Sequence, residues 1–115
     1  MKYENKDEIW MMLYDTNHNF NRCSKIMTTI CHSEEGKYIY IDDINVLSIN
    51  SGEGSILMEH LINYCEATDF AYIKGFISPV DSDHFDRLQH FYEKFGFTFE
   101  LNQTKKQGHI HLSLH

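Results

Sequence analysis

The sequence is poor in the features that mark linkers, secretion or membrane insertion. Its 115 residues include one proline, Pro79, and neither an internal repeat nor a low-complexity tract that would separate domains. No apolar run approaches the length that spans a bilayer, and the N-terminus lacks the apolar stretch and small-residue cleavage site of a signal peptide. We therefore expect a single domain over residues 1–115 that lies in the cytoplasm and does not contact a membrane.

Basic residues are also scarce. Lys and Arg number 10 against 17 Asp and Glu, which gives a formal net charge of -7 at pH 7. They are scattered except for the pair at 105 and 106, so the sequence has no electrostatic footprint for a nucleic-acid backbone. We therefore expect no nucleic-acid partner. An acidic surface favours a cationic substrate such as an amine, and it also serves solubility.

Cysteine is too rare for a disulfide framework. The three cysteines are Cys23, Cys31 and Cys65. Their odd number and their spacing fit free thiols in a reducing compartment better than a set of metal ligands. His109 and His111 lie two apart on an expected strand and would face the same side, as metal-ligating histidines can, but no third ligand accompanies them. We expect no metal.

The remaining composition is typical of a folded domain, with 42% hydrophobic, 14% aromatic and 23% charged residues. Three β-rich segments occupy the first half of the chain, at 9–14, 25–31 and 38–46, with a turn at 33–36 between the last two. Short strands that follow one another through turns predict an antiparallel meander at the N-terminal end.

The middle of the chain changes to a helical period. Between Ser55 and Ala67 the apolar residues recur three and four apart, which predicts an amphipathic helix. They are Leu57, Met58, Leu61, Ile62 and Cys65. The run 71–77 that follows is β-rich and ends before Ser78-Pro79. A strand, a helix and a second strand in this order form a βαβ unit, whose two strands should be parallel.

The last third of the chain predicts a second helix and a hairpin. A cap at Ser82 or Asp83 precedes apolar residues at helical spacing, and Gly96 ends the helix. These apolar residues are Phe85, Leu88, Phe91, Tyr92 and Phe95. Strands at 97–101 and 109–114 then form a hairpin. The fold class is therefore α/β in the broad sense (α+β): a mixed central sheet with a meander, a βαβ unit and a C-terminal hairpin.

A glycine turn joins the meander to the first helix. Gly52 and Gly54 stand just before the expected helix, where the unpaired N–H groups of a helix N-terminus favour a phosphate. Glycine suits this turn because it lets the backbone approach a pyrophosphate and accepts a positive φ. A P-loop is excluded because Ser55-Ile56 follows, where a lysine and a Ser or Thr are needed. A dinucleotide-binding fingerprint is excluded because it needs a third glycine and an acidic residue on the next strand.

Three segments in order carry a more specific signal. They are the strand Tyr38–Val46, the turn and helix start Gly52–Met58, and the helix end Phe91–Phe97, which reads Phe-Tyr-Glu-Lys-Phe-Gly-Phe. This combination resembles the GNAT acetyltransferase superfamily, whose members have a strand ending in valine, a glycine turn and a later Tyr-Glu-Lys-x-Gly-Phe helix end. The resemblance spans roughly residues 38 to 101. It implies an N-acetyltransferase that transfers the acetyl group of acetyl-CoA to a primary amine by direct attack in a ternary complex.

The resemblance also implies roles for individual residues. Backbone groups of Ile44, Asn45 and Val46 would pair with the pantetheine arm of acetyl-CoA. Tyr92 would protonate the departing thiolate, which suits a phenol because its ordinary pKa of about 10 keeps it protonated at neutral pH. Backbone amides of the turn and the first helical turn would hold the pyrophosphate. These are the amides of Ser51, Gly52, Glu53, Gly54, Ser55 and Ile56.

A base for the amine proton has to come from another element. Asp42 and Asp43 interrupt an apolar strand, where carboxylates are costly unless they are solvated, paired or functional. Neighbouring strand residues point to opposite faces, so only one of the two would reach the acetyl group, and Asp43 shares a face with Ile41 and Asn45. Asp43 is therefore the candidate base, with a surface bulge or a strand-edge acid as the structural alternative. Two reserves stand before the second helix, where helix capping is the simpler account: Asp81 and His84.

Departures from the family pattern keep a second function open. Ile49 stands where relatives usually have Arg or Gln, Phe85 replaces an asparagine that bonds the cofactor arm, and Gly75 replaces an acidic residue. Only 37 residues precede Tyr38, so the helices that usually wall the acceptor site are expected to be absent. The site would then be open, or a second copy of the chain would complete it in a homodimer. The alternative function is a catalytically inactive GNAT-fold module that binds or inhibits a protein partner.

Overall fold

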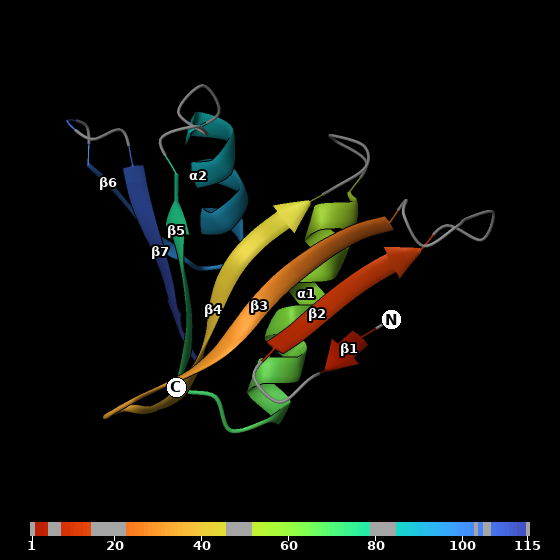
Figure 1. Cartoon of the computed structure of the whole chain (residues 1–115). Helices are drawn as coiled ribbons and strands as arrows, with labels where there is room; N and C mark the ends of the chain where they lie inside the picture. The colour runs from red at the N-terminus through yellow and green to blue at the C-terminus, as the bar shows by residue number, and fades with distance from the viewer. Residues whose placement is uncertain are drawn as a thin grey trace.

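Seven strands and two helices make up the part of the chain that the structure describes (Figure 1). The structure, a computed structural model, describes residues 2–4, 8–14, 23–45, 52–78, 85–102, 104 and 107–114. In chain order the elements are β1 (Lys2–Glu4), β2 (Glu8–Tyr14), β3 (Cys23–Ser33), β4 (Gly36–Asn45), α1 (Glu53–Ala67), β5 (Tyr72–Ile77), α2 (Phe85–Lys94), β6 (Thr98–Asn102) and β7 (Gln107–Ser113). All the expected segments form, with ends shifted by a few residues, and β1 is a strand that the sequence analysis did not predict.

One mixed sheet holds all seven strands, in the order β1-β2-β3-β4-β5-β7-β6. Strands β2 to β4 form the expected antiparallel meander, which β1 extends by one strand, and β4 and β5 pair in parallel as the βαβ unit requires. The C-terminal hairpin is also present, with β7 inserted between β5 and β6. The predicted fold class is therefore confirmed.

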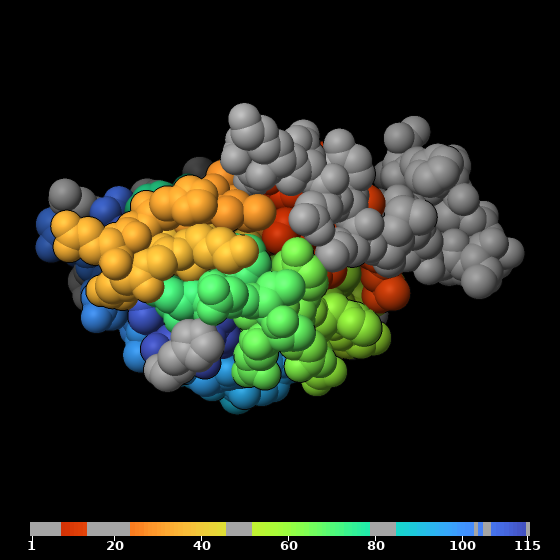
Figure 2. Space-filling model, turned by 90° about the horizontal axis from the view of Figure 1, so that it is seen from below, coloured from red at the N-terminus to blue at the C-terminus, as the bar shows by residue number. Residues whose placement is uncertain are grey.

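The helices cover one face of this sheet. Along β3 the residues of that face, Ser24, Ile26 and Thr28, are fully buried, while their neighbours along the strand are half-buried. Helix α1 lays its apolar side on this face, and Tyr92 of α2 joins the same core. The buried residues of α1 are Leu57, Met58, Leu61 and Cys65. Viewed from below, the atoms of α1 and of the segment that follows it lie on one side of β3 and β4 (Figure 2).

The other face of the sheet carries no helix within the described part of the chain, and rings dominate it. Tyr38 and Tyr72 are stacked with ring centroids 4.6 Å apart, and His111 stacks on Tyr72 at 4.9 Å. The ammonium of Lys74 lies 4.8 Å from the centre of the Tyr38 ring. We call this surface the aromatic face; the strand register assigns to it Trp10, Lys25, Met27, Thr29, Tyr38, Tyr40, Tyr72, Lys74, Phe76, Glu100, His109 and His111. Cross-strand ring pairs stabilise this surface where a helical layer is lacking.

Within the described residues, neither helix combines the length and the apolar character that crossing a membrane requires.

Candidate functional site

Strands β4 and β5 part from each other in the middle of the sheet. Their parallel pairing covers three residue pairs and ends at Ile41 and Gly75. Beyond this point residues 43–45 pair with β3, whereas Phe76 and Ile77 pair with β7. Figure 1 shows β4 bending away from β5 toward the carboxyl ends of both strands. The facing strand edges therefore present backbone N–H and C=O groups that a strand-like ligand can pair with.

A β-bulge in β4 causes this divergence. On β3 the neighbours Thr28 and Met27 pair with Ile41 and Asp43, so Asp42 is one extra residue on β4. An extra residue bends its strand and increases the local twist, which carries the end of β4 away from β5. The Thr29 hydroxyl donates a hydrogen bond of 2.6 Å to the Asp42 carboxylate.

The bulge also corrects the predicted orientation of the two aspartates. Because Asp42 is an extra residue, the alternation restarts at Asp43, which pairs with Met27 on the aromatic face. Ile41 is buried on the helix-covered face, so the expectation that Asp43 shares its face is wrong. The bond to Thr29 places the Asp42 carboxylate on the aromatic face as well. Both exposed carboxylates thus lie on one side of the sheet, so the prediction that the two aspartates point to opposite faces is wrong.

Helix α1 begins beside the end of β4, at Gly52. This residue has φ 83° and ψ -3°, in the left-handed region that suits glycine, and as a glycine it has no side chain with which to cap the helix. The N–H groups of a first helical turn have no acceptor within the helix, so this helix end is suited to an anion. Gly54 lies inside the helix and not in the turn before it, which corrects its expected place. The N–H of Ile56 donates to the Gly52 carbonyl at 3.1 Å, so this amide, expected to contact the phosphate, is engaged within the helix.

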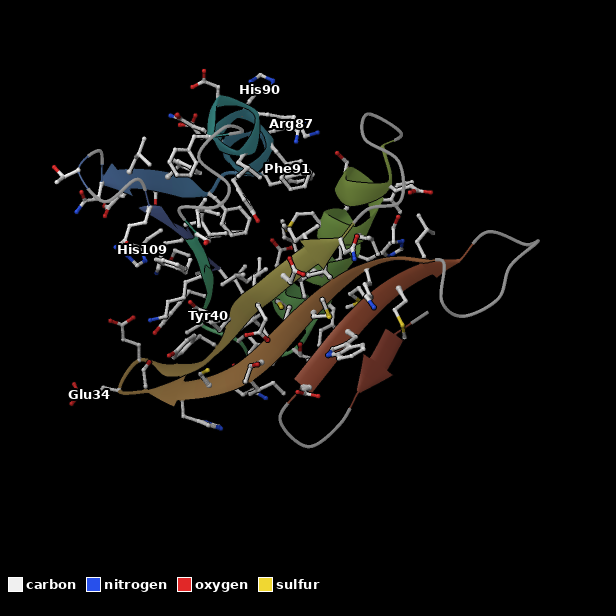
Figure 3. The ribbon with its side chains drawn as sticks, turned by 45° about the horizontal axis from the view of Figure 1, so that its top comes forward. Glu34, Tyr40, Arg87, His90, Phe91 and His109 are labelled. Carbon is white, nitrogen blue, oxygen red and sulfur yellow. The ribbon has the colours of Figure 1, made fainter. Side chains whose placement is uncertain are left out.

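Two polar contacts arrange the start of α1. The Ser24 hydroxyl, fully buried on β3, donates a hydrogen bond of 2.6 Å to the Glu53 carboxylate. This bond holds the negative charge of Glu53 against the sheet. Lys94 of α2 donates from its ammonium to the Ser55 hydroxyl at 2.7 Å. Figure 3 shows Phe91 of α2 reaching toward the same end of α1. The end of α2 therefore brings a positive charge to the first turn of α1, a role that the motif around Lys94 does not predict from sequence.

The Tyr-Glu-Lys-Phe-Gly-Phe motif ends helix α2. The N–H of Phe97 donates to the Tyr92 carbonyl at 3.2 Å, and that of Gly96 to the Glu93 carbonyl at 3.0 Å. Gly96 has φ 94°, and the rings of Tyr92 and Phe97 pack edge to face with centroids 5.5 Å apart. This is a Schellman helix end with its usual apolar contact. The geometry of this helix end therefore accounts for Tyr92, Gly96 and Phe97 without any catalytic role.

The other candidate residues divide into two groups. Ile44, half-buried, and Asn45, exposed, lie on the edge of β4 beyond the last pair with β5. His109 and His111 lie on the aromatic face, and the described residues hold no group of three or more side chains suited to a metal. Outside the described residues fall Val46, Ile49, Ser51, Asp81, Ser82, Asp83 and His84.

Burial shifts the pKa of two groups near the sheet. It raises the pKa of the Tyr40 phenol on the aromatic face, and the neighbouring Asp42 carboxylate adds to this rise. Burial raises the pKa of the Cys65 thiol in α1 to about 12. Cys65 is therefore a protonated core residue at neutral pH and not a nucleophile.

This architecture is the GNAT acetyltransferase fold. A putative GNAT-family acetyltransferase from Desulfovibrio desulfuricans superposes with a TM-score of 0.73 and 14% identity, over 95% of this chain and 70% of that one. The ribosomal-protein-S18-alanine N-acetyltransferase of Escherichia coli superposes with a TM-score of 0.67 and 14% identity, over 96% of this chain and 72% of that one. Arabidopsis thaliana Naa50, in complex with the bisubstrate analogue CoA-Ac-MVNAL, superposes with a TM-score of 0.62 and 21% identity, over 79% of this chain and 66% of that one.

The uncharacterized protein YocC of Bacillus subtilis (strain 168) is similar in sequence, at 29% identity over 120 aligned residues. The match covers 93% of this chain and 71% of YocC. No known family model matches the sequence.

Proposed function

We propose that the protein is an N-acetyltransferase that transfers the acetyl group of acetyl-CoA to a primary amine. The observation that carries this proposal is the end of the β4–β5 pairing beside the glycine N-cap of α1. A ligand with an extended amide-bearing arm and a pyrophosphate fits this pair of features, since one pairs with a strand edge and the other with a helix N-terminus. The structural neighbour bound to a CoA analogue has the same fold, which supports this choice of donor.

The donor would lie along β4 and end at α1. Its pantetheine arm would pair with backbone groups of Ile44, Asn45 and Val46, and its pyrophosphate would take the amides of residues 51–55. Lys94, held at Ser55, would supply the positive charge that Ile49 does not. The Glu53 carboxylate would not repel the pyrophosphate, because Ser24 holds that carboxylate against the sheet.

The acetyl group would pass directly to the acceptor. The amine nitrogen attacks the thioester carbon, a C–N bond forms and the C–S bond breaks. Tyr92, in the turn of α2 that reaches α1, would donate its phenol proton to the departing thiolate. The proton lost by the amine would go to the Asp43 carboxylate, directly or through water, because Asp43 lies on β4 just past the last pair with β5.

Titration of the protein with acetyl-CoA in a calorimeter tests the donor site. We expect binding, and we expect Gly54→Asp to weaken it at least about tenfold, because a carboxylate in the first turn of α1 repels the pyrophosphate. Asn63→Asp is the matched control, since it adds the same charge to an exposed position farther along the same helix. If wild-type protein binds no acetyl-CoA at millimolar concentration, the proposed function is wrong.

Steady-state kinetics with Tyr92→Phe test the chemistry. The ring contact with Phe97 is kept, so the helix end should persist while kcat falls by about 10²-fold or more. The Kd for acetyl-CoA should stay unchanged because the hydroxyl acts in the transition state. An unchanged kcat would assign Tyr92 to the helix end alone. The inactive binding module, which we do not favour, predicts no transfer to any amine even when acetyl-CoA binds.

A further inference from the structure

A row of side chains crosses the aromatic face at the point where β4 and β5 part. On the β5 side Phe76 pairs with His109 of β7, and His109 pairs with Glu100 of β6. The rings of Phe76 and His109 lie 5.5 Å apart between centroids. On the β4 side the row continues with Asp42 and Asp43, immediately after the last pair of the two strands. Figure 3 shows His109 and Tyr40 on the side of the sheet away from α2.

The charge of this part of the aromatic face is negative. Among the described residues of β4, β5, β6 and β7, three carboxylates lie on it: the register places Asp43 and Glu100 there, and the hydrogen bond from Thr29 places Asp42. Lys74 is the one ammonium that these described strands add there, and it lies over the Tyr38 ring. Carboxylates therefore stand at both ends of the row, about 10 Å or more apart given the spacing of neighbouring strands. A ligand with several positive charges in an extended arrangement complements this pattern.

The middle of the row is apolar and accessible. Phe76 is 40% exposed, and among the described residues it is one of two large hydrophobic side chains that are exposed. It lies at the border of the gap, next to Gly75. An alkyl chain that enters the gap from this face would run along the Phe76 ring, and aromatic rings also attract ammonium groups. A lysine side chain, a narrow four-carbon stem with an amine at its end, has this shape.

The row lies on a sheet face and runs across β4, β5, β7 and β6. Small ligands bind mainly in concave sites that bury most of their surface, whereas extended segments of protein bind flat or grooved surfaces. A hollow in the described part of the chain lies elsewhere, around His32, Lys37 and Asp69 at the turn between β3 and β4. A segment of protein is therefore the occupant that suits the row.

We propose that the acceptor is a lysine side chain in a basic segment of a protein, laid across the row from Asp42 to Glu100. This inference rests on the proposed acetyltransferase function. The lysine amine attacks the thioester carbon from the aromatic face, the acetyl group becomes an amide on its nitrogen, and CoA leaves as the thiol. The amine proton passes to Asp43 or to water.

Acetyl transfer to three acceptors tests this substrate class. The first peptide has a blocked N-terminus and one lysine flanked by arginines, the second has the same lysine flanked by glutamates, and the third acceptor is the small polyamine spermidine. We expect kcat/KM for the arginine-flanked peptide to exceed that for the glutamate-flanked peptide at least about tenfold, and the difference to shrink with added salt. Equal rates on the two peptides, or a preference for spermidine, would overturn the inference.

Charge variants on the two faces locate the binding surface. Glu100→Gln should raise KM for the arginine-flanked peptide about twofold and Lys74→Gln should lower it about twofold, because each removes one charge about 10 Å from the acceptor. The matched controls are Glu59→Gln on α1 and Lys37→Gln, whose ammonium lies over Phe70 of the helix-covered core. Neither control should change KM, and no variant should change the Kd for acetyl-CoA.

The outcomes separate the two proposals. If the controls move KM as much as Glu100→Gln and Lys74→Gln do, the acceptor does not lie on the aromatic face and the inference fails while the acetyltransferase survives. Transfer to spermidine without transfer to either peptide has the same meaning. If acetyl-CoA binds and no amine of any kind is acetylated, the proposed function itself is wrong.

Discussion

The two faces of the sheet are held together by different kinds of contact. On the helix-covered face, Ile26 and Ile39 of the sheet and Leu61 of α1 are fully buried between the sheet and the helices. On the aromatic face, Tyr38, Tyr72 and His111 stack across three neighbouring strands. The first arrangement removes more apolar surface from water and so contributes most of the stability, about 25 cal/mol per Å² of apolar surface buried.

The two faces differ in how well they could admit the acceptor of the proposed reaction. A face sealed by helices leaves no approach for a second substrate, whereas the aromatic face carries exposed groups at the end of the parallel pairing. Helix α1 begins near the end of β4 (Figure 1), and Asp42 and Asp43 lie on the aromatic face just past the last pair of β4 with β5. In the proposed reaction the donor would bind at the start of α1 and the acceptor would approach from the aromatic face.

The strongest test of this contrast replaces one large apolar residue on each face. Leu61→Ala should lower the free energy of unfolding by about 2–5 kcal/mol, because it leaves a cavity in the core under α1. Phe76→Ala, at a site that is 40% exposed, should cost no more than about 1 kcal/mol. Urea unfolding measures both. Similar losses for the two variants would mean that the aromatic face is as deeply buried in solution as the core.

A second test replaces two buried glycines with alanine, one close to a backbone oxygen and the other close to a side chain. A Cβ on Gly108 would lie 2.9 Å from the Glu100 carbonyl oxygen, so β6 and β7 would have to move apart, and Gly108→Ala should destabilise by about 1–3 kcal/mol. A Cβ on Gly75 would lie 3.2 Å from the end of the Ile110 side chain, which can shift. Gly75→Ala should therefore cost less in the same urea experiment. The reverse order would show that the core around Ile110 is the more rigid of the two.

A thiol in the helix-covered core, that of Cys65, makes the stability of the protein depend on pH. Burial raises the pKa of Cys65 from 9.0 to about 12, so between these values the unfolded chain binds fewer protons than the folded protein. Stability from this thiol is thus full below pH 9.0 and falls as pH rises toward 12, by at most about 1.4 kcal/mol per pH unit. Urea unfolding of wild type and Cys65→Ala at several pH values measures the difference. A constant difference from pH 8 to 11 would contradict the shift.

The smallest expected effect concerns the donor side. Lys94→Gln should weaken acetyl-CoA binding about threefold, because it removes the ammonium that donates to Ser55. Lys94→Arg should keep most of the affinity, and Lys74→Gln, on the aromatic face, should leave it unchanged. Calorimetry gives all three values. Equal weakening by Lys74→Gln would mean that general charge, and not position, controls the affinity.

Most of the fold could be predicted from local patterns. The apolar period of α1 and the alternation along β2, β3 and β4 are properties of short stretches, so the elements follow from them within a few residues. The three-residue strand β1 was missed because so short an edge strand has too few residues for a recognisable pattern. The end of α2 at Gly96 was expected for the right reason, since glycine accepts the left-handed conformation of a helix end.

The sequence by itself determined the elements other than β1, a glycine at one end of each helix and the acidic pair on β4, because these depend on residue type and near neighbours. The tertiary structure alone decided where those carboxylates lie. The bulge at Asp42 is a mismatch in register between β3 and β4, and no pattern within β4 contains it. One extra residue turns Asp43 from the face of Ile41 to that of Tyr40 and parts β4 from β5, since register is set by pairing between strands and not by either strand alone.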